Sequence, residues 1–497
     1  MTRRSITAWA AVLAVTAAAC SKPVETSLPV SEGKAARDFA TQLTHQVTAD
    51  AMMGHLAKLQ EIADAHGGTR AVGTPGYDAS VDYVVNVLRG KGFEVQTPQF
   101  QTKVFESEKD PVLTVGGAGV KANVLQFSGG TPPGGVSGPL VVAPRDETPG
   151  CAPADYDGLP VKGAVLLVDR GSCHFSEKEA IAAKLGAAAL IIADNVDEEK
   201  MGGTLGQDND VTIPVVSISK ADGARLRGAP GPATLIVDAS TKTIAARNVI
   251  AQTKTGSGQN VVMVGGHLDS VPEGPGINDN GSGVAAVLET AVQLGSEPAV
   301  NNAVRFGFWG AEEVGIVGSK KYVESLNADQ LKDIALYLNF DMLGSPNPGY
   351  FTYDGNQSTE LPSDTAPPRV PEGSGGIERT FVDYLKSVGK AAEDTGFDGR
   401  SDYDGFTMAG IPSGGLFSGA EEEKSPQQAG LWGGTPNASF DPNYHKDTDT
   451  LDHIDRTALG INGGGVAWAV GVYAQDLSGR NGIPAREDRT RHVIGDR

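Results

Sequence analysis

Three apolar segments of the chain are each followed by residues that could bind a metal ion. His267 follows "VVMVGG", Glu312 and Glu313 follow "AVRFGFW", and Asp341 follows "ALYLNF". One such residue would be weak evidence, because polar residues commonly begin the loop after a strand. Three strand ends in succession favour a shared site. Since imidazole and carboxylate groups are common zinc ligands, this pattern predicts a metal centre.

Two other residues extend the set. Asp279 lies in "GPGINDNGSG" just before a predicted helix, where it could also be a capping residue. His445 lies in "NYHKDTDTLDHI" and is one of eight histidines. Two imidazoles and three carboxylates are then available as ligands: His267, Asp279, Glu313, Asp341 and His445. With one carboxylate bridging, they can hold two zinc ions, which together activate a shared water and polarise a carbonyl.

Hydrolysis at such a centre also needs a base. Glu312 and Glu313 are adjacent, so their side chains cannot easily point the same way. One can bind metal while the other reaches the attacking water. Asp269, two residues after His267, could orient that imidazole through its second nitrogen, or it could simply be a turn acid.

The segments that carry these residues are apolar throughout, as in strands buried on both faces. Helical stretches at 282–294 and 319–326 alternate with them. This alternation predicts an α/β fold with a mostly parallel central sheet flanked by helices. Functional groups in such sheets gather at the carboxyl ends of the strands, where the candidate ligands stand.

A second folded unit is expected because 497 residues exceed what one core usually organises. The strands "GAVLLVDRG", "AALIIADN" and "IPVVSISK" surround a helical stretch at 176–185 and predict a smaller, β-rich α/β insert. The segments 355–376 and 478–497 are polar and expected to be poorly ordered. We divide the chain into a signal peptide (1–19), a linker (20–45), a discontinuous larger domain (46–129 and 246–477), an inserted domain (130–245) and a flexible tail (478–497).

The N-terminus has the features of an export signal. Arg3 and Arg4 precede an apolar core at 6–15 and small residues at 17–19, and this core is shorter than the roughly 20 residues of a membrane span. Cys20 resembles the lipid-modified cysteine of bacterial lipoproteins, although Ala17 stands where that signal usually has Leu. We therefore expect a periplasmic, surface or extracellular protein, either tethered to a membrane through Cys20 or released.

Charge and cysteine usage exclude other chemistry. Lys and Arg number 41 against 61 Asp and Glu, and the net charge of -20 opposes binding to nucleic acid. Besides Cys20 the chain has only Cys151 and Cys173. In an exported protein such a pair predicts a disulfide rather than a metal or catalytic site.

At the candidate ligands the sequence resembles the M28 family of zinc aminopeptidases, and it looks closest to secreted bacterial double-zinc leucine aminopeptidases. The resemblance runs through "GGHLDSVPEGPGINDNGSGVAAVLE", "FGFWGAEEVGIVGSKKYV", "YLNFDMLGSPNPGYF", "GRSDYDGF" and "FDPNYHKDTDTL". The insert resembles a protease-associated (PA) domain in Cys151, "DRGSCHF" and "AAKLGAAALIIADN". The resemblance implies a zinc exopeptidase-like fold carrying a PA insert.

The resemblance also implies roles for individual residues. His267 and Asp341 would bind one zinc, Glu313 and His445 the other, and Asp279 would bridge them. Glu312 would be the general base and Asp269 the acid behind His267. Tyr444 would donate to the developing oxyanion, Arg400 would contact substrate, and Met342 and Phe417 would line a hydrophobic pocket.

We therefore expect a monomeric aminopeptidase that acts on peptide or protein N-termini, favouring Leu or other large apolar residues. Three departures from the family stand out: Tyr403 where relatives often have His, Asn443 and Thr448 in place of cysteines, and Gly460 and Gly464 near the family's calcium-binding acids. Calcium activation is not expected there, because glycine offers no carboxylate. The alternatives are a carboxypeptidase, a glutaminyl cyclase, or a non-catalytic receptor on the same two domains.

Overall fold

The computed structural model describes residues 32–107, 109–145, 148–197, 201–359 and 369–495. The predicted signal peptide and Cys20 lie outside these residues. Within the described part of the chain, no helix has the length and apolar character needed to cross a membrane.

The larger domain is built on an eight-stranded sheet. Its strands, in spatial order, are β1 (Glu94–Gln96), β12 (Val249–Gln252), β14 (Asn302–Trp309), β13 (Ser257–His267), β15 (Ile334–Phe340), β18 (Ser413–Phe417), β16 (Phe351–Tyr353) and β17 (Glu393–Thr395). The central strands β14, β13, β15 and β18 are mutually parallel, and antiparallel strands flank them. The predicted α/β fold with a mostly parallel central sheet is confirmed.

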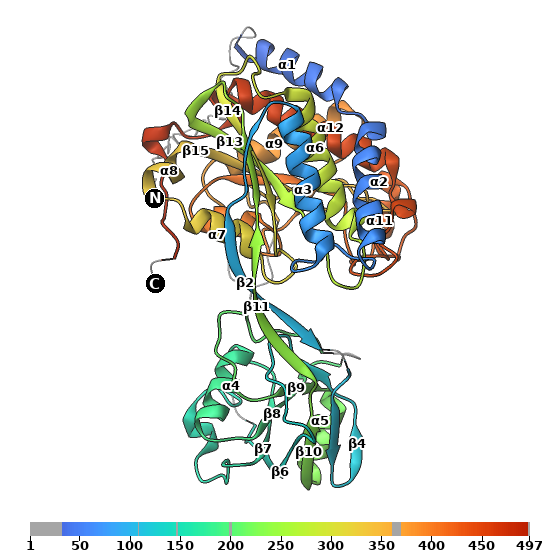
Figure 1. The fold of residues 1–497 in the computed structure, drawn as a ribbon, viewed down its shortest axis with the longest axis vertical. Coiled ribbons are helices and arrows are strands. Elements are labelled where there is room, and N and C mark those ends of the chain that lie inside the picture. Colours follow the sequence, from blue (N-terminus) through green and yellow to red (C-terminus); the bar gives the residue numbers. More distant parts are fainter. Residues whose placement is uncertain (1–31, 108, 146–147, 198–200, 360–368, 496–497) are drawn as a thin grey trace, which may run out of the picture.

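Helices cover both faces of this sheet (Figure 1). Val262 and Leu336 belong to the main hydrophobic core, whereas Met263 and Tyr337 face a second core, so alternate residues of each strand are buried on opposite sides. The main core is formed with α1 (Glu32–Gln46), α2 (Ala49–Ala65), α3 (Pro75–Gly90), α6 (Gly283–Leu294), α9 (Ser374–Ser387) and α12 (Arg456–Gln475). The second is formed with α7 (Val317–Glu324), α8 (Ala328–Asp333) and α10 (Tyr403–Met408), while α11 (Pro426–Trp432) lies at the periphery.

The inserted domain has its own eight-stranded sheet. Its order is β4 (Ala118–Val120), β3 (Val112–Val115), β10 (Pro232–Ile236), β6 (Val136–Val142), β7 (Val165–Asp169), β8 (Ala189–Ala193), β9 (Val215–Ile218) and β5 (Asn123–Val124). Helices α4 (Phe175–Lys184) and α5 (Lys220–Gly228) pack against it. The sheet begins at β3 rather than at the predicted boundary of 130, because β3 pairs with β10 from the far end of the insert.

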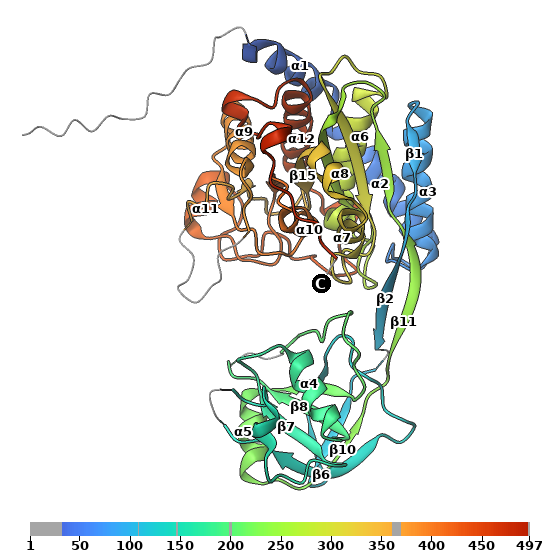
Figure 2. The ribbon, with the colours of Figure 1, turned by 90° about the vertical axis from the view of Figure 1, so that its left-hand side faces the viewer.

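A two-stranded ribbon joins the two domains. Strand β2 (Gln99–Ser107) pairs antiparallel with β11 (Ala239–Arg247) along its whole length, and Figures 1 and 2 show the insert beyond this ribbon. Strand β12 continues from β11, and β14 runs antiparallel to β12 and ends where β12 begins. The carboxyl ends of β14 and its parallel neighbour β13 therefore face the insert.

Two predicted boundaries differ from the structure. Most of the expected linker is helix α1, whose Ala36, Ala40 and Leu43 are buried. It packs closely on α12, where a Cβ at Gly471 would lie 2.5 Å from Ala40 Cα. The segment is polar on average and two of its buried side chains are small alanines, so the helix was not evident in the sequence.

The expected flexible tail is also packed against the larger domain. Arg489 is buried and donates hydrogen bonds to the carbonyl oxygens of Gln259 and Lys332. Arg491 donates to the carbonyls of Leu331 and Gly410. The tail is anchored by charged side chains bonded to backbone, which polar composition alone does not reveal.

The predicted disulfide between Cys151 and Cys173 is present in the insert, with a Cα–Cα distance of 5.9 Å. It closes a loop with a sequence separation of 22, for which chain entropy gives a stabilisation of about 3 kcal/mol. We expect the double variant Cys151→Ser, Cys173→Ser to unfold its insert at a lower temperature. Calorimetry of the variant and of oxidised wild-type protein measures this difference. Equal melting temperatures for oxidised wild type and variant would contradict it.

Candidate active site

The predicted ligands converge at the sheet edge that faces the insert. His267 is the last residue of β13, Glu313 lies in the loop after β14, and Asp341 directly follows β15. Asp279 lies in the turn Ile277–Ser282 that leads into α6, and His445 lies in the loop before α12. The three strand ends and two loops bring together residues that are up to 178 positions apart, as 445 minus 267 gives.

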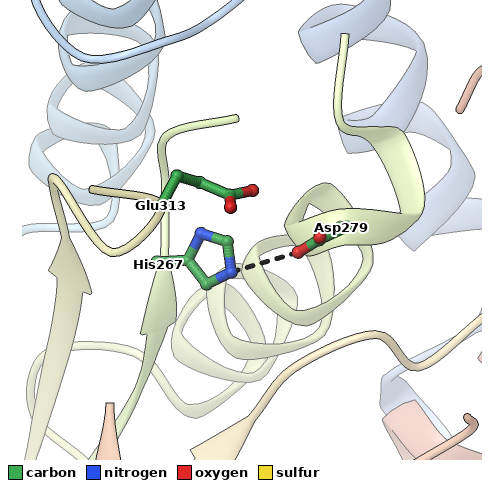
Figure 3. A group of neighbouring side chains, drawn as sticks. All are labelled: His267, Asp279 and Glu313. Atoms are coloured by element: carbon green, nitrogen blue, oxygen red, sulfur yellow. Dashed lines mark ion pairs between the residues drawn. The ribbon is translucent and has the colours of Figure 1, made fainter. Parts of the chain in front are cut away.

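These side chains form two sets on either side of Asp279. His267 Nε2 lies 3.2 Å from Asp279 Oδ1 and 3.4 Å from Asp341 Oδ1. His445 Nε2 lies 3.2 Å from Asp279 Oδ2 and 3.1 Å from Glu313 Oε2. Each oxygen of Asp279 therefore faces a different imidazole. In Figure 3 the side chains of His267, Asp279 and Glu313 point toward one another, and one potential ligand atom from each lies within 4.8 Å of the others.

The site has the properties expected of a cation-binding centre. Glu313 Oε1 and Asp341 Oδ1 are buried without a hydrogen-bond partner. Burial raises the pKa of Glu313 to about 7 in the metal-free chain, and the charge of Asp279 adds to this effect. Buried carboxylates without hydrogen bonds are costly unless a positive charge compensates them. The residues present therefore fit divalent cations.

Glu312 lies close to this group but is oriented differently from Glu313. Its Oε2 is 4.0 Å from His267 Nε2, and its side chain is only 10% exposed. Burial raises the pKa of the Glu312 carboxyl well above its usual range in the metal-free chain, while His267 opposes this shift and Glu313 adds to it. The two adjacent glutamates thus occupy different positions in one site.

Asp269 lies beside the second ring nitrogen of His267, and its backbone makes the shorter contact. His267 Nδ1 is hydrogen-bonded to the backbone carbonyl of Asp269 at 3.1 Å, whereas the carboxylate is 3.7 Å away. The carboxylate oxygens also accept the backbone N–H groups of Glu312 and Glu313, at 3.2 and 3.3 Å. Asp269 therefore contacts the imidazole with both its backbone carbonyl and its carboxylate, and the same carboxylate holds the glutamate turn. Sequence spacing does not distinguish these two roles.

The pocket beside the five ligands contains the other predicted residues. Met342, Phe417, Arg400 and Tyr444 line it, together with Tyr353, Tyr403, Ala420 and Glu422. Arg400 is paired with two acids, Glu421 at 2.8 Å and Glu422 at 3.5 Å. Its guanidinium also donates to Tyr444 Oη at 3.4 Å. Among the described residues that line the pocket, Arg400 is the one Lys or Arg, and its charge is already balanced.

Sequence reasoning missed two residues that hold the ligand loops. The fully buried guanidinium of Arg70 donates to the carbonyls of Leu268, Pro275 and Gly276. These carbonyls lie near the two ends of the segment that joins His267 to Asp279. Asp449 accepts the backbone N–H of Asp279 at 3.0 Å. Arg70 lies in the loop "GGTRAVGTPGY" and Asp449 in "NYHKDTDTL", and neither segment reveals partners that are so distant in sequence.

Comparison with known proteins agrees with this geometry. The model of Peptidase family M28 matches residues 248–470, and the PA domain model matches residues 136–226. LpqL of Mycobacterium tuberculosis, a probable lipoprotein aminopeptidase, is 67% identical over 491 residues, covering 99% of this chain and 98% of its own. The chain belongs to peptidase family M28. The predicted class of enzyme, a zinc-dependent aminopeptidase of this family with an inserted PA domain, is confirmed.

Other relatives of this M28 chain carry similar names. A probable leucine aminopeptidase 2 of Aspergillus oryzae is 41% identical over 424 residues, covering 84% of this chain and 82% of its own. Among solved structures, the aminopeptidase from Aneurinibacillus sp. strain AM-1 has a TM-score of 0.71 at 28% identity, covering 88% of this chain and 96% of its own. BSAP, a zinc aminopeptidase from Bacillus subtilis, has a TM-score of 0.61 at 26% identity, covering 88% and 98%.

Proposed function

We propose that this M28 chain is an exported aminopeptidase that removes N-terminal residues from peptides with the help of two zinc ions. The observation that carries the proposal is the position of Asp279, whose two carboxylate oxygens each face a separate imidazole–carboxylate set. The proposed ligands are His267 and Asp341 for one ion and Glu313 and His445 for the other. Two zinc ions held there would lower the pKa of a shared water and polarise the scissile carbonyl.

The remaining residues have roles in substrate binding and proton transfer. Glu312 takes a proton from the attacking water and delivers it to the leaving amine, as general base and then general acid. Its oxygen lies 4.0 Å from His267 Nε2, whereas each proposed carboxylate ligand lies 3.1–3.4 Å from the imidazole of its own set, and this difference supports the division of roles. Tyr444, which lines the same pocket, donates a hydrogen bond to the developing oxyanion.

The pocket supports an apolar N-terminal side chain over a C-terminal carboxylate. Met342 and Phe417 provide apolar surface in the pocket that the ligands also line, and Tyr353 and Tyr403 add aromatic surface. A carboxypeptidase would need an uncompensated cation for the substrate carboxylate, and Arg400 already pairs with two acids. We therefore propose a preference for Leu or another large apolar N-terminal residue, with Arg400 contacting the substrate.

A substrate panel tests the reaction directly. We expect hydrolysis of leucyl-p-nitroanilide and of unblocked peptides, and loss of activity when the substrate amine is acetylated. A carboxypeptidase would instead cleave the acetylated peptides from their C-terminus, and a glutaminyl cyclase would release ammonia from N-terminal glutamine. Either of these results, without aminopeptidase activity, would contradict the proposal.

The zinc content is a separate prediction. Five ligands with one bridging acid exceed the three protein ligands of a mononuclear catalytic site, so we expect two ions per chain at saturation. Elemental analysis during titration of the chelator-treated protein measures this. A single ion at saturation, with no gain in activity on further zinc, is the contrary result.

The name of LpqL as a probable lipoprotein aminopeptidase supports export of this chain and a membrane tether through Cys20. We propose that the mature protein is a monomer whose substrates are peptide or protein N-termini outside the cytoplasm.

A further inference from the structure

Both adjacent glutamates lie in a closed turn that joins β14 to α7. The carbonyl of Gly310 at its start accepts the backbone N–H of Gly318 at its end, at 3.0 Å. Inside the turn the carbonyl of Glu312 accepts the N–H of Gly315 at 2.8 Å. We call residues 310–318 the glutamate turn. Because its backbone is bonded across the turn, a shift at Gly315 is passed to Glu312.

The backbone of the glutamate turn is strained. Ala311 and Ile316 have positive φ values of 61° and 60°, in the left-handed region that residues other than glycine rarely occupy. Gly315 has a φ of 123°, a value that favours glycine. Strain of this kind persists only where neighbouring groups hold the backbone in place. The glutamate turn therefore depends on contacts from outside it.

The root of the ribbon that carries the insert supplies one of these contacts. Asn248 joins β11 to β12 and is 2% exposed. Its Nδ2 donates to the carbonyl of Gly318 at 2.8 Å, and its Oδ1 accepts the N–H of Gly310 at 3.0 Å. Its own N–H donates to the carbonyl of Pro98, just before β2, at 3.0 Å. One buried residue thus bonds both ends of the glutamate turn to the root of the ribbon.

A side chain from the insert reaches the middle of the glutamate turn. Gln207 lies between β8 and β9, and its Oε1 accepts the hydroxyl of Thr102 at 3.2 Å and the N–H of Lys103 at 3.5 Å, both on β2. Strand β2 lies beside α7, the helix that follows the turn (Figure 2). The amide nitrogen of Gln207 lies next to Gly315, where a Cβ would be 3.2 Å from it. Glycine at this position lets the insert contact the glutamate turn.

We propose that Gln207 is a positioning residue through which the inserted domain holds Glu312 in place. Glu313, as a proposed ligand, is also fixed by the metal that it binds, whereas Glu312 lies outside both ligand sets and depends on the backbone that carries it. A general base must lie within hydrogen-bond reach of the proton that it takes. This inference rests on the proposed role of Glu312 as that base, and it gives the insert a part in the reaction.

Gln207→Ala removes the contact with Gly315 and the bonds to β2. We expect kcat to fall about 10-fold, within the roughly 100-fold that a misplacement of about 1 Å can cost. KM and zinc content should stay at wild-type values, because the pocket and the ligands are unchanged. Steady-state kinetics with leucyl-p-nitroanilide and elemental analysis of the same samples measure all three. Gln207→Glu keeps the length of the side chain and an oxygen for Thr102, and should restore most of kcat.

Thr102→Val tests the support that the ribbon gives to Gln207. Valine keeps the shape of Thr102, which is 3% exposed, but cannot donate to Gln207, so kcat should fall by a smaller factor. Asn209→Ala is the matched control. Asn209 lies in the same loop of the insert, but its side chain donates to the carbonyl of Leu205 within that loop, at 2.7 Å. The control should keep the kcat of wild type.

Wild-type kcat in Gln207→Ala would overturn the inference. So would an equal loss of kcat in Asn209→Ala, since this would indicate a general loosening of the insert loop. Loss of zinc from Gln207→Ala would also contradict it, because the insert would then hold a ligand rather than the base. A wild-type chain without aminopeptidase activity would contradict the proposed function itself, and this inference with it.

Discussion

Glu312→Gln is expected to lower kcat by at least about 10²- to 10⁴-fold, the range of general acid–base catalysis, while both zinc ions stay bound. The amide has nearly the shape of the carboxylate but cannot accept the proton of the attacking water. Because the Glu312 carboxylate lies 4.0 Å from His267 and outside the two proposed ligand sets, its loss should leave the metal content unchanged. Steady-state kinetics with elemental analysis on the same sample provide both measurements.

The adjacent glutamate is the matched control for this experiment. Glu313 lies 3.1 Å from His445 and has a buried, unpartnered oxygen, so Glu313→Gln should lower both zinc affinity and activity. Excess zinc should restore part of the activity of Glu313→Gln and none of the activity of Glu312→Gln. If Glu312→Gln kept near-normal kcat, or lost zinc as Glu313→Gln does, the assignment of base and ligand would be wrong.

Arg70→Met is expected to lower the free energy of unfolding by about 3–5 kcal/mol, as removal of one partner from a buried charged contact does. The change leaves the carbonyls of Leu268, Pro275 and Gly276 without their donor. Burial lowers the pKa of Arg70 to about 10, while Asp449 and other nearby carboxylates oppose this shift, so the side chain is charged at neutral pH. Its loss also removes a positive charge from a group of buried acids.

Denaturant titration with a fluorescence or circular dichroism readout measures this effect. Arg70→Lys keeps the charge but not the forked donor, and should recover only part of the stability. Arg227→Met in the insert is the matched control, because Arg227 is also nearly buried and also donates to a carbonyl, that of Ala143. The control should leave zinc content and activity unchanged. Unaltered stability in Arg70→Met would show that these three hydrogen bonds contribute little.

The sequence predicted the central sheet and the placement of the ligands because both depend on local signals. Each apolar strand could be recognised alone, and the residue after it then had a known place at the sheet edge, as for His267 and Asp341. His445 gave no such local signal, because it lies in a loop and is one of eight histidines. Its backbone has a positive φ of 56°, as does that of Met342 at 54°, and such strain becomes visible only in the structure.

What could not be predicted depends on contacts between distant segments. Arg70 lies in a loop rich in glycine, which by itself predicts only a connection between two helices. Its hydrogen bonds to the carbonyls of Leu268 and Pro275 are evident only in the folded structure. The carboxylate of Asp269 likewise bonds to residues more than 40 positions away. Helix α1 was missed because alanines bury little surface, yet they allow close packing on α12.

The ribbon of β2 and β11 is the connection through which the insert could be exchanged during evolution or by engineering. Because Gln99 and Arg247 are directly paired, the chain leaves and re-enters the larger domain at neighbouring points. The insert is thus a detachable module: a tight hairpin turn can close the two strands, or a foreign domain with adjacent termini can replace it, without moving the strands of the catalytic sheet. Exchange of inserts at this junction would change what surrounds the candidate active site while the proposed metal ligands stay in place.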